Sequence, residues 1–296
     1  NYLNSTEINI DFWETIEIEY PTRNYSIKDN TREKHNAVYL AAAVSYIKNA
    51  PFTSADISKN KVNILTNAGN AKKLNDNSTY ADFQNALNKG LKAIDNLLAD
   101  PLAAIESIQK FLDLPSRYEK AVEGRVASYL GTYERLKYSI DSLIDKKYFE
   151  SIGASTIASM ADAMVNPLFG DYVLIADIEK MYTKLNDTYE DYKKVLDQNK
   201  VSVYDIKNNW NPDATVQQEL NDLVVFTLAN LYRLTFVAKR ERVIYTTKKT
   251  NAILLVHRYV GLDNLDEHLE NFISRNNIRL NELFTIQKGR KIVYIK

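Results

Sequence analysis

Apolar residues recur three or four positions apart through most of the chain, a spacing that predicts a mainly helical protein. The first such stretch covers residues 29–50 and stops at Pro51, because proline cannot continue a helix. Asp100 stands directly before a second stretch, residues 101–112, as an N-cap followed by proline in the first helical position. Local capping and helix-stopping residues therefore predict at least these two helices.

Three longer helices are expected in the middle of the chain. Residues 116–147 carry one continuous amphipathic stripe and are predicted to form a single long helix. The stretch "GASTIASMADAMVNP" is a small-residue helix that lets neighbours approach closely and stops at Pro167. Asp213 can cap a further helix that runs to Leu234. Its apolar residues lie nearly all round the helix, so we expect it to be central.

A stripe between residues 178 and 196 alternates steps of four and three, which is the pattern of a coiled-coil seam. Its members are Ile178, Tyr182, Leu185, Tyr189, Tyr192 and Leu196. The stripe can pair with the helix expected at 118–144 as an antiparallel hairpin, which is the default because both stripes belong to one polypeptide. It can also pair with a neighbouring subunit in a ring. The interface candidates in this stripe are Tyr182, Leu185, Tyr189 and Tyr192.

The two ends of the chain show strand-like patterns. The opening "INIDFWETIEIEYPTRNYSI" alternates in places, is rich in Ile and Tyr, and predicts one or two strands interrupted at Pro21. Two strands do not form a stable sheet alone, so this piece packs on the helices or completes a sheet elsewhere. Near the other end we expect a helix at 251–259 that stops at Gly261, and an apolar strand-like run after Gly289.

Together these patterns predict a mainly α protein with long antiparallel helical hairpins or a bundle, a short N-terminal β segment and a small α/β C-terminal module. The expected domains are a strand segment at residues 1–30, a helical domain at residues 31–248 and the C-terminal module at residues 249–296.

Composition narrows the class of protein. With 296 residues, of which 45% are apolar, the chain can bury a substantial core. Lys plus Arg and Asp plus Glu number 38 each, but residues 239–296 hold twelve basic and six acidic residues, a local charge of +6. Residues 1–238 are therefore at −6. No apolar run is long enough to span a bilayer, so no membrane span is expected.

Candidate catalytic and metal-binding residues are scarce. The chain has no cysteine, which excludes disulfides, zinc–thiolate sites and thiol catalysis. His35, His257 and His268 lie too far apart in sequence for a local metal-ligand spacing, and packing is the simpler role for each. No nucleotide-binding, metalloprotease, serine-hydrolase or EF-hand motif occurs. We therefore expect a protein that is not an enzyme and that binds no cofactor or metal.

Basic residues gather near the C-terminus in "AKRERVIYTTKK" and "KGRK". They could contact phosphates or an acidic partner, which leaves a nucleic-acid-binding protein as the least favoured hypothesis. The simpler interpretation is that they are the solvated ends of secondary-structure elements, so nucleic acid is not an expected partner.

The stretch "TNAILLVHRYVGLDNLDEHLENFISRNNIRLNELFTIQKGRKIVYI" resembles the end of the bacteriophage DNA-circularisation, or Mu-type tail hub, protein family. In that family an apolar helix reaches a Tyr and Gly turn, a short helix carries a basic-Asn-x-Ile element, and a Gly precedes a final apolar run. The matching residues here are Tyr259, Gly261, Leu269, Arg275, Asn276, Asn277, Ile278, Gly289 and Ile292 to Ile295. The helix "PLAAIESIQKFLDLP" and the long helix after it are also similar, so the resemblance covers residues 81–296.

The same stretch is similar to a degenerate LysM module. The residues that carry this similarity are Leu265, Asn277, Ile278, Gly289 and Ile295. LysM-like modules serve as docking pieces in baseplate proteins and bind glycan in wall proteins. Residues 262–265, Leu-Asp-Asn-Leu, replace the usual Gly-Asp-Thr-Leu start, which argues against glycan binding.

These resemblances imply a structural component of a phage tail hub or baseplate, or of a related contractile injection machine. The implied partners are other tail or baseplate proteins and further copies of the chain in a ring of six or three. The implied location is the virion tail, with the host cytoplasm during assembly. The C-terminal interface candidates are Arg275, Asn277, Ile278, Gly289 and Arg290. The alternative is a cell-envelope protein that binds peptidoglycan through the LysM-like module.

Overall fold

The computed structural model describes residues 27–48, 77–115, 121–141, 143–165, 174–200, 210–236, 238–261 and 265–295, together with residues 54, 57, 58, 61 and 172. In this part of the chain the protein is mainly helical, as predicted, with one two-stranded antiparallel sheet. The strands expected before residue 27 lie outside the described residues. Residues 27–30, which the sequence analysis assigned to the same segment, are the start of the first helix.

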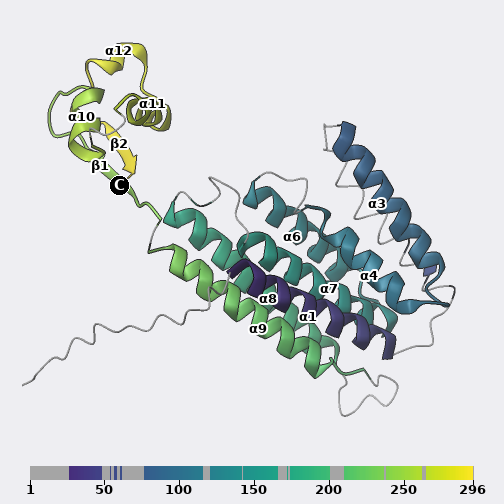
Figure 1. Cartoon of the computed structure of the whole chain (residues 1–296). Coiled ribbons are helices and arrows are strands. Elements are labelled where there is room, and N and C mark those ends of the chain that lie inside the picture. The colour runs from purple at the N-terminus through teal and green to yellow at the C-terminus, as the bar shows by residue number, and fades with distance from the viewer. Residues whose placement is uncertain are drawn as a thin grey trace, which may run out of the picture.

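Figure 1 shows a bundle of long helices, called the helical unit below, and a smaller unit at the C-terminal end of the chain. The described helices of the helical unit are α1 (Ile27–Lys48), α3 (Asn77–Asp95), α4 (Pro101–Leu112), α6 (Val122–Tyr138), α7 (Leu143–Val165), α8 (Ile175–Asn199) and α9 (Ala214–Leu234). The C-terminal unit, residues 240–295, contains β1 (Glu241–Tyr245), α10 (Ala252–Tyr259), α11 (Leu265–Asn276), α12 (Leu280–Leu283) and β2 (Lys291–Ile295). None of the described helices is both long and apolar enough to cross a membrane.

Helix α7 is the centre of the helical unit and packs against α1, α4, α6, α8 and α9. Its small residues allow close approach: a Cβ atom on Gly153 would lie 3.2 Å from the ring of Tyr192 on α8. The expectation that the helix after Asp213 is central is wrong, because α9 leaves Val225 56% exposed. A run of small residues identifies the central helix here, since it admits neighbours on every side.

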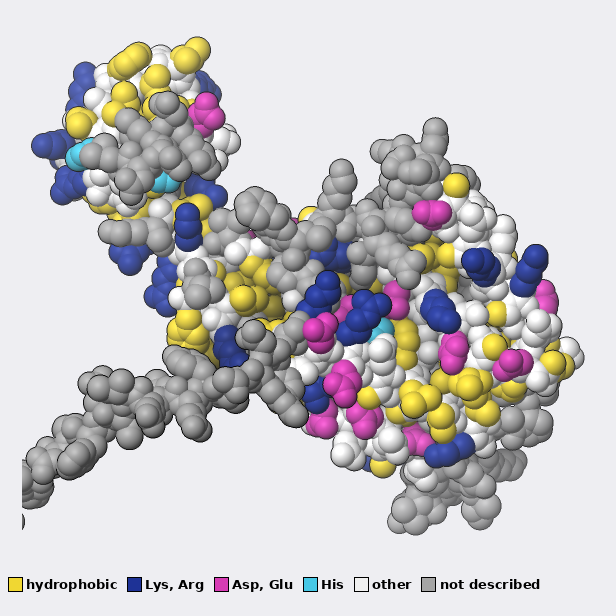
Figure 2. Space-filling view, viewed as in Figure 1, with side chains coloured by type: hydrophobic (Ala, Val, Ile, Leu, Met, Phe, Trp, Pro, Cys, Tyr) yellow, Lys and Arg dark blue, Asp and Glu magenta, His cyan; other side chains and the backbone are white. Residues whose placement is uncertain are grey.

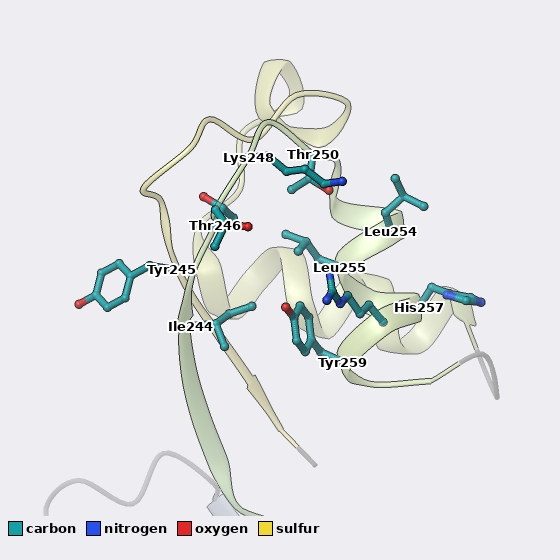
Figure 3. Close-up of a pocket in the computed structure, with 11 residues that line it drawn as sticks. Ile244, Tyr245, Thr246, Lys248, Thr250, Leu254, Leu255, His257 and Tyr259 are labelled. Carbon is teal, nitrogen blue, oxygen red and sulfur yellow. The ribbon is translucent and has the colours of Figure 1, made fainter.

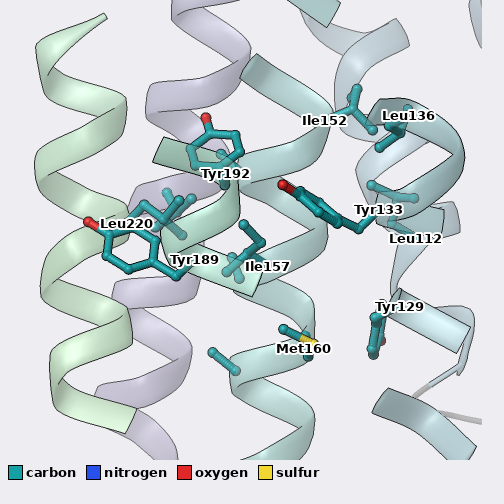
Figure 4. Packing of buried hydrophobic residues seen from close by; sticks show 14 of the residues in the cluster. Leu112, Tyr129, Tyr133, Leu136, Ile152, Ile157, Met160, Tyr189, Tyr192 and Leu220 are labelled. Carbon is teal, nitrogen blue, oxygen red and sulfur yellow. The ribbon is translucent and has the colours of Figure 1, made fainter. Parts of the chain in front are cut away.

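Tyrosine rings fill much of the space between α7 and its neighbours (Figure 4). Tyr133 and Tyr192 flank Phe149 with ring centroids 5.8 and 5.5 Å away, and all three side chains are buried. The Tyr192 hydroxyl donates to the backbone oxygen of Glu150 at 2.8 Å, and the Tyr133 hydroxyl donates to Asp191 at 2.8 Å. Each ring buries its apolar area while its polar end is hydrogen-bonded.

The single helix predicted at 116–147 is two helices, which is a correction to the sequence analysis. Helix α6 ends at Tyr138, and the Ser139 hydroxyl at its end donates to the Leu136 carbonyl at 2.8 Å. Before the next helix, the backbone N–H of Asp141 donates to the Asp145 carboxylate at 3.1 Å. Side chains at both helix ends therefore satisfy backbone groups. The amphipathic stripe keeps its period across the break, so the period alone does not reveal where the helix is interrupted.

The predicted seam lies in α8 and packs inside the chain, mostly against α9 and α7. Leu185, Tyr189 and Tyr192 are buried there and form no free surface. Tyr182 is 39% exposed, and Met181 takes its place in the core. The α6 helix, which was the expected hairpin partner, contacts α8 less extensively, and Lys137 is part of that contact through its ion pair with Asp191 at 2.7 Å.

Two helix boundaries that the sequence predicted are confirmed by their hydrogen bonds. The Asp100 carboxylate accepts from the N–H of Ala103 at 3.1 Å at the start of α4. Helix α10 ends at Tyr259 and is followed by Gly261, whose φ of 131° only glycine adopts freely and whose N–H donates to the Val256 carbonyl at 3.1 Å. Local capping chemistry was sufficient to place both ends.

The C-terminal unit has a hydrophobic core of its own, which α10, α11 and β2 supply with residues such as Val256, Phe272 and Ile292. Strand β1 pairs with β2 in the register Glu241↔Ile295 to Tyr245↔Lys291. The unit therefore begins near residue 240, whereas the sequence analysis placed the boundary at 248/249. The boundary moves because residues 241–245 form β1, which pairs with β2 of the C-terminal unit. Residues 239–248 also lack the helical spacing of apolar residues found in the bundle.

Candidate functional site

The end of α11 anchors the C-terminal unit. The side-chain amide of Asn276 donates to the carbonyl of Val293 at 2.8 Å and accepts from the N–H of Val293 at 2.7 Å. Asn276 thus takes the place of a neighbouring strand along one edge of β2. Asn277 adopts the left-handed conformation, with φ of 47°, and lets the chain turn into Ile278, which is buried.

The five C-terminal interface candidates have internal partners. Arg275 forms an ion pair with Glu241 at 3.1 Å, and Arg290 lies 3.6 Å from Glu282 and donates to the Asn276 carbonyl at 3.2 Å. Gly289 has φ of 85° and its N–H donates to the Thr246 carbonyl at 2.7 Å. With Asn277 and Ile278, these residues hold α11, the turn before β2 and the strands together.

Asn276 is the residue that sequence reasoning did not select, although it stands inside the matched "RNNI" element. The only available signal was a pair of asparagines at the end of a helix, and that pair does not say which of the two turns the chain. The structure separates their roles: Asn277 provides the backbone turn, while the side chain of Asn276 holds β2.

Strand β1 keeps one edge free in the described part of the chain, since β2 is its only strand neighbour there. The N–H of Thr246 donates to the Arg290 carbonyl at 3.1 Å, which fixes the parity of the ladder. By alternation, the backbone groups of Ile244 face β2, and those of Val243 and Tyr245 face outward. Val243 is 49% and Tyr245 65% exposed. β1 therefore presents both unpaired backbone groups and apolar side chains.

A groove with a cavity volume of about 650 Å³ lies between this strand and α10 (Figure 3). Ile244, Leu255 and Tyr259 lie between the strand and the helix, while Tyr245 points away from them. The Tyr259 ring packs on Tyr294 of β2, with centroids 5.0 Å apart. The groove therefore has an apolar floor fixed by the core of the unit.

The groove is bordered by cationic side chains. Lys248 and Arg258 line it, and His257 lies beside them. The ion pairs found in the described part of the C-terminal unit join other residues, Arg275 with Glu241 and Arg290 with Glu282. Figure 2 shows Lys and Arg side chains gathered over this unit, whereas most acidic side chains on the same face lie over the helical unit. The surroundings of the groove thus favour an acidic ligand.

A buried polar cluster in the helical unit is the other place where reactive side chains meet. The Asp113 carboxylate accepts from Tyr39 at 2.7 Å and from Ser159 at 2.9 Å, and lies 3.5 Å from His35. Burial lowers the pKa of His35, but Asp113 outweighs this effect and leaves it raised. Burial raises the pKa of Asp113, but the nearby His35 and the hydrogen bonds from Tyr39 and Ser159 outweigh this effect and leave it lowered.

This cluster has the geometry of a structural network. The Ser159 hydroxyl donates to Asp113 and is not bonded to His35, so the nucleophile–base contact of a hydrolase is missing. Its members come from α1, α7 and the end of α4, which the network joins. No group of three or more His, Asp or Glu side chains among the described residues could hold a metal ion.

No protein-family model matches the sequence, and no curated protein matches it at a significant level. The candidate site is therefore defined by the geometry and charge of the C-terminal unit alone.

Proposed function

We propose that this protein is a structural component of a phage tail hub or baseplate, or of a related contractile injection machine, and that its C-terminal unit docks onto a neighbouring protein. It acts without catalysis, in the virion tail, after assembly in the host cytoplasm. Its partners are other tail or baseplate proteins and further copies of itself in a ring.

The observation that carries the proposal is the amount of apolar surface on the small C-terminal unit. Its exposed large apolar side chains are Val243, Tyr245, Ile253, Leu254, Leu280 and Phe284. Leu280 is 88% and Phe284 73% exposed on and beside α12. Large exposed apolar patches are typical of protein contact sites. A surface of this kind supports a docking role better than a catalytic one.

A second apolar surface stands at the end of α9, where the chain leaves the helical unit. Tyr232 and Phe236 are exposed and pack edge to face, with ring centroids 5.2 Å apart. Backbone pairing of Leu174 with Lys239, including a 3.1 Å hydrogen bond from Ile175 to Lys239, ties the connecting segment to the start of α8. Each copy would contact one neighbour through its C-terminal unit and another through this surface of its helical unit, and these contacts together would close a ring.

The test is the mass of the full chain by light scattering, followed by electron microscopy, alone and with a tail extract. We expect assemblies that disappear in a Leu280→Asp, Phe284→Asp variant while its circular dichroism stays unchanged. Tyr138→Asp is the matched control, because Tyr138 is exposed on the helical unit. A monomer under every condition, or assemblies that persist in the docking variant, would overturn the proposal.

The alternative, a cell-envelope protein that binds peptidoglycan, is favoured by one observation. The groove is lined by Tyr259, Thr247 and Thr250, which offer an aromatic face and hydroxyl groups suited to sugars. Sedimentation with insoluble peptidoglycan tests it. Retention of the wild-type chain that is lost in Tyr259→Ala would support this function and make docking to tail proteins the lesser role of the unit.

A further inference from the structure

We propose that the groove between β1 and α10 binds residues 15–20 of a second copy of this chain as an added strand. This inference rests on the proposed function, since it names the partner of the same docking unit. The sequence predicts too few N-terminal strands for a stable sheet of their own. The groove offers one of these strands a partner.

The sheet can accept a strand at one edge. Asn276 occupies the edge of β2 through its two hydrogen bonds to Val293, whereas the outward backbone groups of Val243 and Tyr245 on β1 have no strand neighbour in the described residues. A free strand edge beside a helix is the arrangement in which extended peptides add to a sheet: main-chain hydrogen bonds provide affinity, and alternate side chains provide specificity.

The two faces beside this edge differ in chemistry. The outer face of β1 presents Val243 and Tyr245, while the groove is lined by the cations Lys248 and Arg258 together with its apolar residues. Because successive side chains of a strand point to opposite faces, a strand added here meets apolar side chains on one side and positive charge on the other. The best occupant alternates apolar with acidic residues.

Residues 15–20, "TIEIEY", have this alternation. Ile16 and Ile18 would lie beside Val243 and Tyr245, and Glu17 with Glu19 would face the cations of the groove. Residues 1–22 hold five acidic residues and no basic ones, against the charge of +6 on residues 239–296. Pro21 follows at once and cannot donate to a ladder, so it limits the added strand to this segment.

A neighbouring copy is the source of the strand. Residues 21–26 connect the segment to α1, which packs against α7 and α9 inside the helical unit. Figure 1 shows the C-terminal unit standing apart from the bundle, and the ring in the proposed function places other copies of the chain beside it. Donor and acceptor are different surfaces, so the contact is head to tail, which closes into a ring when the rotation between copies permits.

Disulfide trapping tests the contact cleanly because the chain has no cysteine. Variants with Ile16→Cys, Ile18→Cys or Tyr20→Cys, which cover the possible registers, are each mixed with full-length Val243→Cys and oxidised mildly. We expect a cross-linked dimer from at least one mixture. Tyr138→Cys replaces Val243→Cys in the control mixtures. Equal cross-linking to the control position would overturn the inference.

Charge reversal tests the orientation. Glu17→Lys with Glu19→Lys should lower the cross-linked yield about tenfold, as expected for two partly exposed ion pairs of about 0.7 kcal/mol each. Lys248→Glu with Arg258→Glu in the acceptor should restore it. Failure of the reversed acceptor to restore the yield would contradict this orientation and overturn the pairing with the groove.

Two further outcomes separate this inference from the proposed function. A chain carrying both Ile18→Cys and Val243→Cys that closes on itself at every protein concentration would show the segment pairing within one copy, against the inference. If Ile16→Lys, Ile18→Lys leaves assemblies intact while Leu280→Asp, Phe284→Asp removes them, the docking function stands and this inference fails. Absence of both assemblies and cross-links would overturn both.

Discussion

The C-terminal unit leaves more of its large apolar side chains exposed for its size than the helical unit does. In the helical unit Tyr133 and Tyr192 are buried, and their hydroxyls find acceptors inside the core. In the C-terminal unit Tyr245 and Phe284 point into solvent, although that unit has far fewer residues with which to build a core. The contrast lies in how well each unit buries its large apolar side chains.

The same contrast holds for polar groups. In the helical unit Asp113, at the end of α4, lies among three polar partners, two from α1 and one from α7. In the C-terminal unit the cations around the groove stand outside the ion pairs of Arg275 and Arg290. Buried polar networks fix how helices pack, whereas uncompensated surface charge steers association. Substitutions in the two units should therefore affect different measurements.

The largest expected effect is on the core of the helical unit. Tyr192→Ala removes a fully buried ring that contacts Phe149 and Gly153, and should lower the free energy of unfolding by about 3–5 kcal/mol. Urea unfolding followed by circular dichroism measures it. Tyr182→Ala on the same helix is the control and should cost less than about 1 kcal/mol. Equal losses in the two variants would contradict the assignment of the buried face of α8.

Glu150 makes the stability of the helical unit depend on pH. Burial raises its pKa to about 7, although the N–H of Asp213 donates to it. The folded state binds this proton more tightly than the unfolded state, so stability is lost as pH rises from about 4.5 to about 7. Glu150→Gln should match the wild type near pH 4.5 and exceed it by at most about 3 kcal/mol at pH 8.

Urea unfolding of both proteins at the two pH values measures this difference, in which the pH dependence of all other groups cancels. Glu179→Gln, the same substitution at an exposed site on α8, is the matched control variant. A Glu150→Gln variant whose advantage is the same at pH 4.5 and pH 8 would show that the carboxyl does not carry the effect.

Asn276 should matter for the C-terminal unit alone. Asn276→Ala removes both side-chain hydrogen bonds to Val293, and should weaken that unit by about 2 kcal/mol. Hydrogen exchange should become roughly 30-fold faster in β2 and stay unchanged in α7. Asn281→Ala, exposed on α12, is the control. Faster exchange in both units would mean that they unfold together.

The smallest effect is expected at the Arg275–Glu241 ion pair. Both side chains are about one third exposed, so Arg275→Ala should cost less than about 1 kcal/mol. The loss should shrink in 1 M salt, where exposed charges are screened. The thermal midpoint of the unit at low and high salt measures it. A larger loss that salt leaves unchanged would assign Arg275 a packing role.

Local capping residues were sufficient to predict the start of α4 and the end of α10. Most of the features that were missed depend on how the helices pack in three dimensions. Asp100 and Gly261 act on backbone groups within a few residues, so a linear reading finds them. The exchange of Tyr182 for Met181 depends on the direction from which α7 and α9 approach α8, which no single stripe records. The break after Ser139 was missed for another reason, because the stripe keeps its period across it.

The groove beside β1 and the free edge of that strand were harder still to predict. The basic residues near the groove were visible in the sequence, but the free edge of β1 appears only once its pairing with β2 is known. The matched "RNNI" element lies in this unit, where its side chains make internal contacts, and the exposed side chains around it belong to no motif.

The hydrogen bonds of Asn276 have one more consequence. A two-stranded ribbon with two open edges can recruit strands on both sides and become the seed of a fibre. Here the side chain of Asn276 occupies the edge of β2, so a further strand can be added only at the edge of β1. One edge of the sheet therefore stays able to accept a strand, while a single amide group prevents the addition of a strand at the other edge.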